Sequence, residues 1–150
     1  MRLSTKGRYA VMAMADLAAH GAERAVSLAE IAARQEISLD YLEQLFARLR
    51  RGGLVNSVRG PGGGYRLAKA AADTRVSEIV LAVDEPLRAT RCAGGDAPAK
   101  GCMASGEQCL THGLWEALGR QIESYLDGVS LADVLNRRFD GAPQKHEAAA

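Results

Sequence analysis

Three cysteines and one histidine, residue types that commonly bind metals, lie close together in the second half of the chain. Cys92, Cys102, Cys109 and His112 are separated by nine, six and two residues. Two of the cysteines stand among glycine, aspartate and serine, whereas inert buried cysteines usually lie in apolar surroundings. Three thiolates and one imidazole form a four-ligand set that suits zinc or an iron–sulfur cluster. The spacing therefore predicts a metal or cluster site, with three free cysteines and an unrelated histidine as the alternative.

A second group of polar side chains, in the N-terminal half, has the hydrogen-bonding chemistry of base recognition. A glutamine pairs with adenine through two hydrogen bonds, and a carboxylate accepts a hydrogen bond from the amino group of cytosine. For Asp40 a merely solvated position is an equally good interpretation, because its charge also repels phosphate. The side chains expected on the exposed face of one helix are Ser38, Asp40, Tyr41, Glu43, Gln44, Arg48 and Arg51. Arg59 follows them, where a hairpin tip would carry its guanidinium into a minor groove.

The elements that would position this second group are helices followed by a hairpin. A first helix is expected from Thr5 to about His20, and Ser27 with Glu30 forms a capping-box pattern that opens a helix through Arg34. After a break, Ser38 caps a helix to about residue 51. Strand-like segments at 54–59 and 65–67 flank a glycine-rich turn. This order predicts a winged helix-turn-helix, in a mainly α fold with a small β-hairpin wing.

The rest of the chain is expected to form three further helices. The first covers 77–84, and a long helix covers about 107–127 after an irregular segment at 86–106. Ser130 and Asp133 cap a last short helix. Along the long helix an apolar residue recurs every four positions, at Leu110, Leu114, Leu118, Ile122 and Leu126. We expect a winged-helix domain at 1–85, a metal-binding loop at 86–106, a dimerisation helix and short helix at 107–138, and a frayed tail at 139–150.

The distribution of charge favours a polyanionic partner. Although the net charge is +1, residues 1–69 hold 11 Lys and Arg against 6 Asp and Glu, a difference of +5, and residues 70–150 hold 8 against 12, a difference of −4. A basic half is the usual footprint of a nucleic-acid binder. The sequence has no membrane-spanning apolar stretch and no secretion signal, so we expect a cytoplasmic protein. It also lacks a catalytic triad pattern and a nucleotide-binding loop, which argues against an enzyme.

Several segments together resemble the IscR family of iron–sulfur cluster regulators, and the resemblance covers residues 1 to about 136. The matching segments are 1–10, 38–46, 58–65, 82–85, 89–92 and 109–115. The resemblance implies a bacterial, homodimeric winged-helix transcription regulator whose long helix crosses between subunits. It implies control of genes for iron–sulfur cluster assembly, and the assembly machinery as the donor of the cluster.

The resemblance also implies which residues do the binding. It assigns a [2Fe–2S] cluster to the four candidate ligands, and the family's DNA-facing positions correspond to Ser38, Tyr41, Glu43, Gln44, Arg59, Gly60 and Pro61. Two departures stand out. The loop between Cys92 and Cys102 is longer than expected for close relatives, and Asp40 occupies the place of a smaller serine.

Our hypothesis from the sequence joins these parts into a switch. The apolar stripe of the long helix pairs two subunits, which then bind pseudo-palindromic DNA sites. In this hypothesis, cluster occupancy changes which DNA sites are bound. Glu43 is the candidate residue for discriminating between sites, because its carboxylate must either find a hydrogen-bond donor on the DNA or carry a desolvation cost. The alternatives are a winged-helix regulator with structural zinc or thiol-redox sensing, and a redox protein whose cluster carries electrons.

Overall fold

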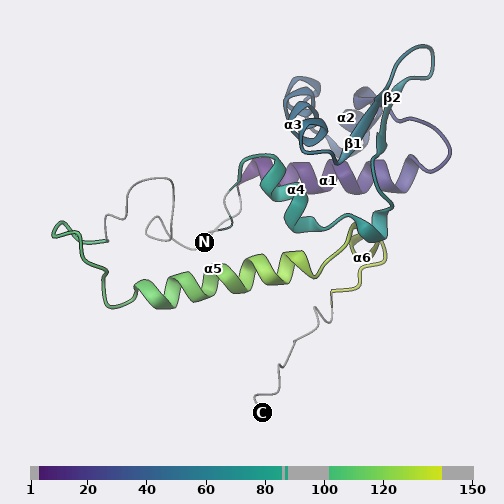
Figure 1. Ribbon diagram of the computed structural model, residues 1–150. Coiled ribbons are helices and arrows are strands. Elements are labelled where there is room, and N and C mark those ends of the chain that lie inside the picture. The colour runs from purple at the N-terminus through teal and green to yellow at the C-terminus, as the bar shows by residue number, and fades with distance from the viewer. Residues whose placement is uncertain (1–3, 86, 88–101, 140–150) are drawn as a thin grey trace.

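Six α-helices, one 3-10 helix and one two-stranded sheet make up the described part of the chain (Figure 1). The computed structural model describes residues 4–85, 87 and 102–139. The mainly α fold with a small hairpin confirms the predicted fold class. The elements are α1 (Thr5–His20), α2 (Leu28–Gln35), α3 (Leu39–Arg51), β1 (Val55–Val58), β2 (Gly64–Leu67), η1 (Ala71–Asp73), α4 (Val76–Ala82), α5 (His112–Asp127) and α6 (Leu131–Leu135).

Serine side chains begin four of these helices. Each accepts a hydrogen bond from a backbone N–H of the first turn, which would otherwise lack a partner. The serines are Ser4, Ser27, Ser38 and Ser130. The capping boxes predicted at α2 and α6 are present, because Glu30 and Asp133 bond back to the backbone N–H of their cap residues. A hydrogen bond from Arg24 and a second from the Ser27 backbone lower the pKa of Glu30 to about 2.

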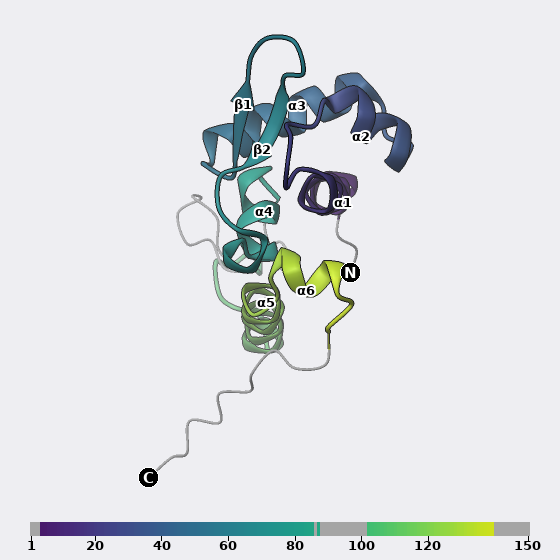
Figure 2. The same cartoon turned by 90° about the vertical axis from the view of Figure 1, so that its right-hand side faces the viewer.

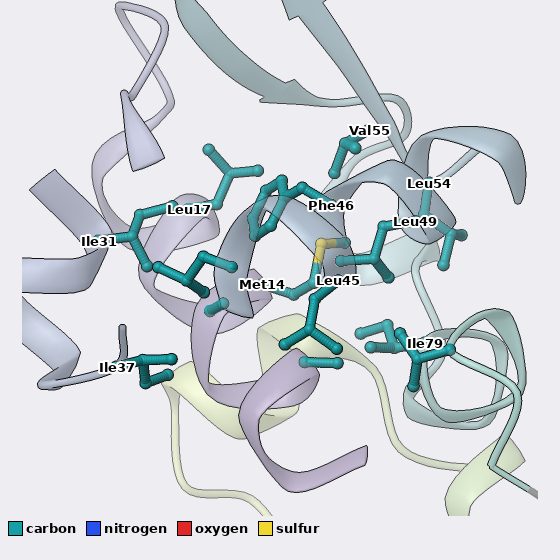
Figure 3. Packing of buried hydrophobic residues seen from close by; sticks show 14 of the residues in the cluster. Met14, Leu17, Ile31, Ile37, Leu45, Phe46, Leu49, Leu54, Val55 and Ile79 are labelled. Atoms are coloured by element: carbon teal, nitrogen blue, oxygen red, sulfur yellow. The ribbon is translucent and has the colours of Figure 1, made fainter. Parts of the chain in front are cut away.

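One hydrophobic core joins the N-terminal helices to the hairpin. Met14 and Leu17 of α1 and Phe46 of α3 are fully buried at its centre (Figure 3). The ring of Phe46 also packs edge-on against Tyr65 of β2, with centroids 4.9 Å apart. From the far end of the chain, Leu131 of α6 enters the same cluster. Helix α3, the second helix of the helix-turn-helix, therefore has a rigid support, because four of its apolar side chains are buried: Leu42, Leu45, Phe46 and Leu49.

The hairpin is attached to the helices by hydrogen bonds as well as by packing. β1 and β2 are antiparallel, with Val55 opposite Leu67. Val26, just before α2, bridges to Tyr65 through two backbone hydrogen bonds of 3.0 and 2.8 Å. At Gly64 a Cβ atom would lie 2.2 Å from the carbonyl oxygen of Val26, so only glycine permits this close approach. The wing is thereby held against the helix-turn-helix.

Helix α5 lies on the opposite side of the molecule from α3 and the wing, with α1 and α4 between them (Figures 1 and 2). A second apolar cluster holds α5 in place, formed by Val76 and Val80 of α4, Leu87 and Val129, with Ile122 and Leu126 packed against it. No helix in the described ranges is long and apolar enough to cross a membrane.

The structure corrects two predicted helix boundaries. The long helix begins at His112 and not near residue 107, because a turn closed by the His112 N–H and the Cys109 carbonyl precedes it. Cys109 and Leu110 are therefore not on the helix, although the periodicity had placed them there. Helix α4 ends at Ala82 and not at Asp84, whose φ of +57° is incompatible with a continuing helix.

Candidate DNA-binding face and metal centre

The exposed face of α3 carries most of the predicted base-reading side chains. Ser38, Asp40, Glu43 and Gln44 are exposed, while the apolar stripe of the same helix is buried. The Ser38 hydroxyl oxygen accepts the Tyr41 N–H at 3.2 Å. Its single hydrogen remains available as a donor, so capping the helix and contacting DNA are compatible roles for this side chain.

Two residues expected on this face have other contacts. Tyr41 is half-buried, and its ring meets that of Tyr9 edge-on, with centroids 6.0 Å apart. Arg48 donates to the Val83 carbonyl at 3.2 Å and to the Asp84 carboxylate at 3.0 Å. Arg48, which we expected among the exposed side chains of this face, is instead half-buried and ties α3 to the residues that follow α4.

The tip of the wing presents Arg59, Gly60 and Pro61, all exposed. Gly60 has a φ of +99° and Gly62 a φ of +72°, values that L-residues with side chains rarely adopt. The Gly63 N–H donates to the Gly60 carbonyl at 2.9 Å and closes the turn. The glycines therefore hold Arg59 at a narrow tip.

A buried carboxylate that sequence reasoning missed orients the helix-turn-helix. Asp16 of α1 has a fully buried side chain, and it accepts hydrogen bonds from the guanidinium of Arg34 at 2.8 and 3.0 Å and from the amide of Gln35 at 2.8 Å. Burial raises the pKa of Asp16, but the hydrogen bonds from Arg34 and Gln35 outweigh it and hold the pKa below its usual value. The available signal was one acidic residue within an otherwise apolar stretch of α1, residues 9–19, because a buried carboxylate requires a partner.

Two of the four predicted metal ligands meet at the start of α5. The Cys102 sulfur lies 3.1 Å from Nδ1 of His112, and both side chains are half-buried. Cys109 is also half-buried, with its sulfur 3.6 Å from the Thr111 hydroxyl. Cys92 lies outside the described residues. Within the described ranges, no three Cys, His, Asp or Glu side chains are grouped to hold a metal ion. A thiol in contact with an imidazole nevertheless fits the donor chemistry of zinc and of iron–sulfur clusters.

The apolar stripe predicted for dimerisation divides into two parts. Ile122 and Leu126 pack against the second apolar cluster of their own chain. Leu114 and Leu118 stay exposed, at 60% and 36%, and Leu110 is exposed in the turn before the helix. The N-terminal half of α5 therefore presents apolar surface that the described part of the chain leaves uncovered.

The chain matches one protein family over nearly its whole length. The model of the Rrf2 family, described as iron-dependent transcriptional regulators, matches residues 3–137. The chain belongs to the Rrf2 family. Its membership makes it a DNA-binding transcription regulator and not an enzyme.

Individual relatives confirm the resemblance to IscR. The HTH-type transcriptional regulator IscR of Photorhabdus laumondii is 54% identical over 138 residues, which are 92% of this chain and 81% of that protein. Among solved structures, IscR of T. potens has a TM-score of 0.72 at 39% identity, over 100% of this chain and 94% of that one. CymR of B. subtilis, the global cysteine regulator, has a TM-score of 0.73 at 30% identity, over 91% and 98%.

Proposed function

We propose that this Rrf2 regulator is a homodimer that senses a [2Fe–2S] cluster and controls genes for iron–sulfur cluster assembly. Cys92, Cys102, Cys109 and His112 would hold the cluster, which the assembly machinery would supply. The dimer would bind pseudo-palindromic promoter sites, and cluster occupancy would alter which sites it binds.

The observation that carries this proposal is the contact between the Cys102 sulfur and Nδ1 of His112 at 3.1 Å. Nine residues separate Cys102 from His112 in the sequence, so the contact requires the 102–111 segment to fold back on the start of α5. Cys109 lies within that segment, three residues before His112. When bound, the cluster would link these side chains to the loop that carries Cys92, and a single imidazole among thiolates would make it more easily lost than an all-cysteine cluster.

Dimerisation through α5 is supported by the apolar surface at its start. Leu114, Leu118 and Trp115 are exposed on the first turns of the helix. Large exposed apolar side chains in a continuous stretch usually mark an interface. Because α5 lies opposite α3 and the wing (Figure 2), two subunits joined through α5 would leave α3 and the wing of each subunit free to bind DNA.

Purification under anaerobic conditions tests the cluster directly. We expect visible absorption and stoichiometric iron and sulfide, because an iron–sulfur cluster absorbs visible light and zinc does not. The Cys92→Ala variant should lose this absorption and stay dimeric in light scattering. A colourless wild-type protein with stoichiometric zinc would replace the proposed sensor with a structural zinc site. A monomeric Cys92→Ala variant would mean that the cluster holds the dimer together.

A further inference from the structure

Helix α5 begins differently from the serine-capped helices. Thr111 occupies its N-cap position, yet its side chain accepts no hydrogen bond from a backbone N–H of the first turn. Threonine is a favoured N-cap residue because its hydroxyl satisfies a free backbone N–H there. At α1, α2, α3 and α6 the N-cap serine does so. The Thr111 hydroxyl is therefore engaged in something other than capping.

The Thr111 hydroxyl lies between an indole and a cysteine sulfur. Nε1 of Trp115 donates to Oγ1 of Thr111 at 3.2 Å. The sulfur of Cys109 lies 3.6 Å from the same oxygen. An indole N–H can only donate, so the hydroxyl must accept in the first contact. Its one hydrogen remains for the second contact, where a thiolate can only accept. With Cys109 as a thiolate, the form that binds a metal, the hydrogen bonds therefore run in one direction, from Trp115 through Thr111 to the sulfur of Cys109.

We propose that Thr111 is a positioning residue for the Cys109 thiolate, with Trp115 fixing the direction in which its hydroxyl points. This inference rests on the proposed function, in which Cys109 is a cluster ligand. Groups that hydrogen-bond to a metal ligand orient it and tune the metal, and their loss typically weakens metal binding 10- to 100-fold. Hydrogen bonds to the sulfurs also help to set the reduction potential of a cluster.

The same contacts connect the ligand to the helix. Cys109 lies in the turn before α5, whereas Trp115 lies on the first turns of the helix itself. Thr111 bridges the two, so the sulfur is held relative to α5, whose first residue is His112. Cys109 in the turn and His112 on the helix, two of the proposed ligands, are thus both held by the start of α5.

Variants of Thr111 separate the hydroxyl from the shape of the side chain. Thr111→Val removes the hydroxyl and keeps the volume, and Thr111→Ser keeps the hydroxyl. Because Thr111 does not cap α5, the valine variant should retain wild-type helicity by circular dichroism. Trp115 is the only tryptophan, so its fluorescence in metal-free protein reports the indole contact. We expect its emission to shift in the valine variant and to stay at the wild-type value in the serine variant.

Anaerobic cluster-loaded proteins give the decisive comparison. The valine variant should release its cluster to a chelator about tenfold faster than wild type, and the serine variant at the wild-type rate. The hydrogen bond favours the more negatively charged, reduced cluster, so its removal should lower the one-electron potential. A tenfold change in how strongly the hydrogen bond favours the reduced over the oxidised cluster corresponds to a shift of about 59 mV in this potential. Wild-type release and potential in the valine variant would overturn the role of Thr111, whereas a wild-type protein without a cluster would overturn the proposed function itself.

Discussion

The carboxylate of Glu85 caps the first turn of α1 by accepting the N–H of Gly7 at 2.6 Å. It also accepts the N–H of Ser4, so one buried side chain satisfies two backbone donors of a helix 78 residues or more away in the sequence. A negative charge at a helix N-terminus is also stabilised by the helix dipole. The contact fixes the residues that follow α4 to the start of α1.

Gly7→Ala should destabilise the protein through this contact. A Cβ atom at Gly7 would lie 2.3 Å from Oε2 of Glu85, so this oxygen would have to move away and give up its hydrogen bond from the Gly7 N–H. Hydrogen bonds to charged groups contribute about 1.5–3 kcal/mol each, against about 1 kcal/mol gained by replacing glycine in a helix. We expect the free energy of unfolding of the metal-free protein, measured in urea, to fall by about 0.5–2 kcal/mol, the difference between these two effects. Gly113→Ala is the matched control, because a Cβ atom there meets open space and should be neutral or stabilising. Equal effects at both positions would contradict this account.

Asp16→Asn should weaken the protein in a pH-dependent way. The folded state holds the pKa of Asp16 below its ordinary value of 3.8. A depressed pKa contributes stability that is present above the ordinary value and is lost as the pH falls through the lower, folded value. The wild type should therefore exceed the variant in urea unfolding at pH 7, by about 1–3 kcal/mol, and the difference should shrink towards pH 3. A difference that stays constant over this range would mean that the charge of Asp16 is not what binds Arg34.

Leu118→Glu should prevent dimerisation. Leu118 is 36% exposed in the described structure, and a carboxylate buried at an interface without a partner is costly. We expect the variant to sediment as a monomer at concentrations where wild type is dimeric. Ser124→Glu places the same charge at an exposed polar position of α5, about 120° around the helix from Leu118, and should leave the dimer intact. A dimeric Leu118→Glu protein would exclude this face as the interface.

Arg59→Ala should weaken DNA binding about tenfold and relax any preference for narrow-groove sequences. The glycine turn holds Arg59 at the tip of the wing, where a minor groove would receive it. Lys69→Ala removes an equal charge, but Lys69 is paired with Glu78 and should matter little. Fluorescence anisotropy over a panel of sites measures both variants. If Arg59→Ala bound the whole panel with wild-type affinity, the wing would have no reading role.

Local sequence signals predicted α2, α3 and the hairpin well. Ser27 and Glu30 marked the start of α2 because a capping box is complete within four residues. Ser38 marked the start of α3 because serine is a favoured N-cap residue, and its hydroxyl oxygen accepts the N–H of Tyr41. The glycines after Arg59 marked the hairpin. In each case the residues that define the element are neighbours in the sequence, so no knowledge of the tertiary structure was needed.

Long-range contacts and the start of α5 were not predictable in this way. Asp16 meets Arg34 across 18 residues, and Glu85 meets Gly7 across 78, so neither partner is visible in a local pattern. Leu110 falls in the four-residue repeat of the long helix, although it lies in the turn before it. Periodicity alone does not locate a helix end, because a turn can continue the spacing without continuing the helix.

The central claim is that cluster occupancy changes which DNA sites this Rrf2 protein binds. Anaerobic footprinting of the cluster-loaded and the cluster-free protein on one set of promoters tests it most directly. We expect at least one class of site to be protected only by the loaded form, at concentrations where the cluster-free dimer still protects another. Identical footprints and affinities for the two forms, with the cluster verified by its absorption, would contradict the claim.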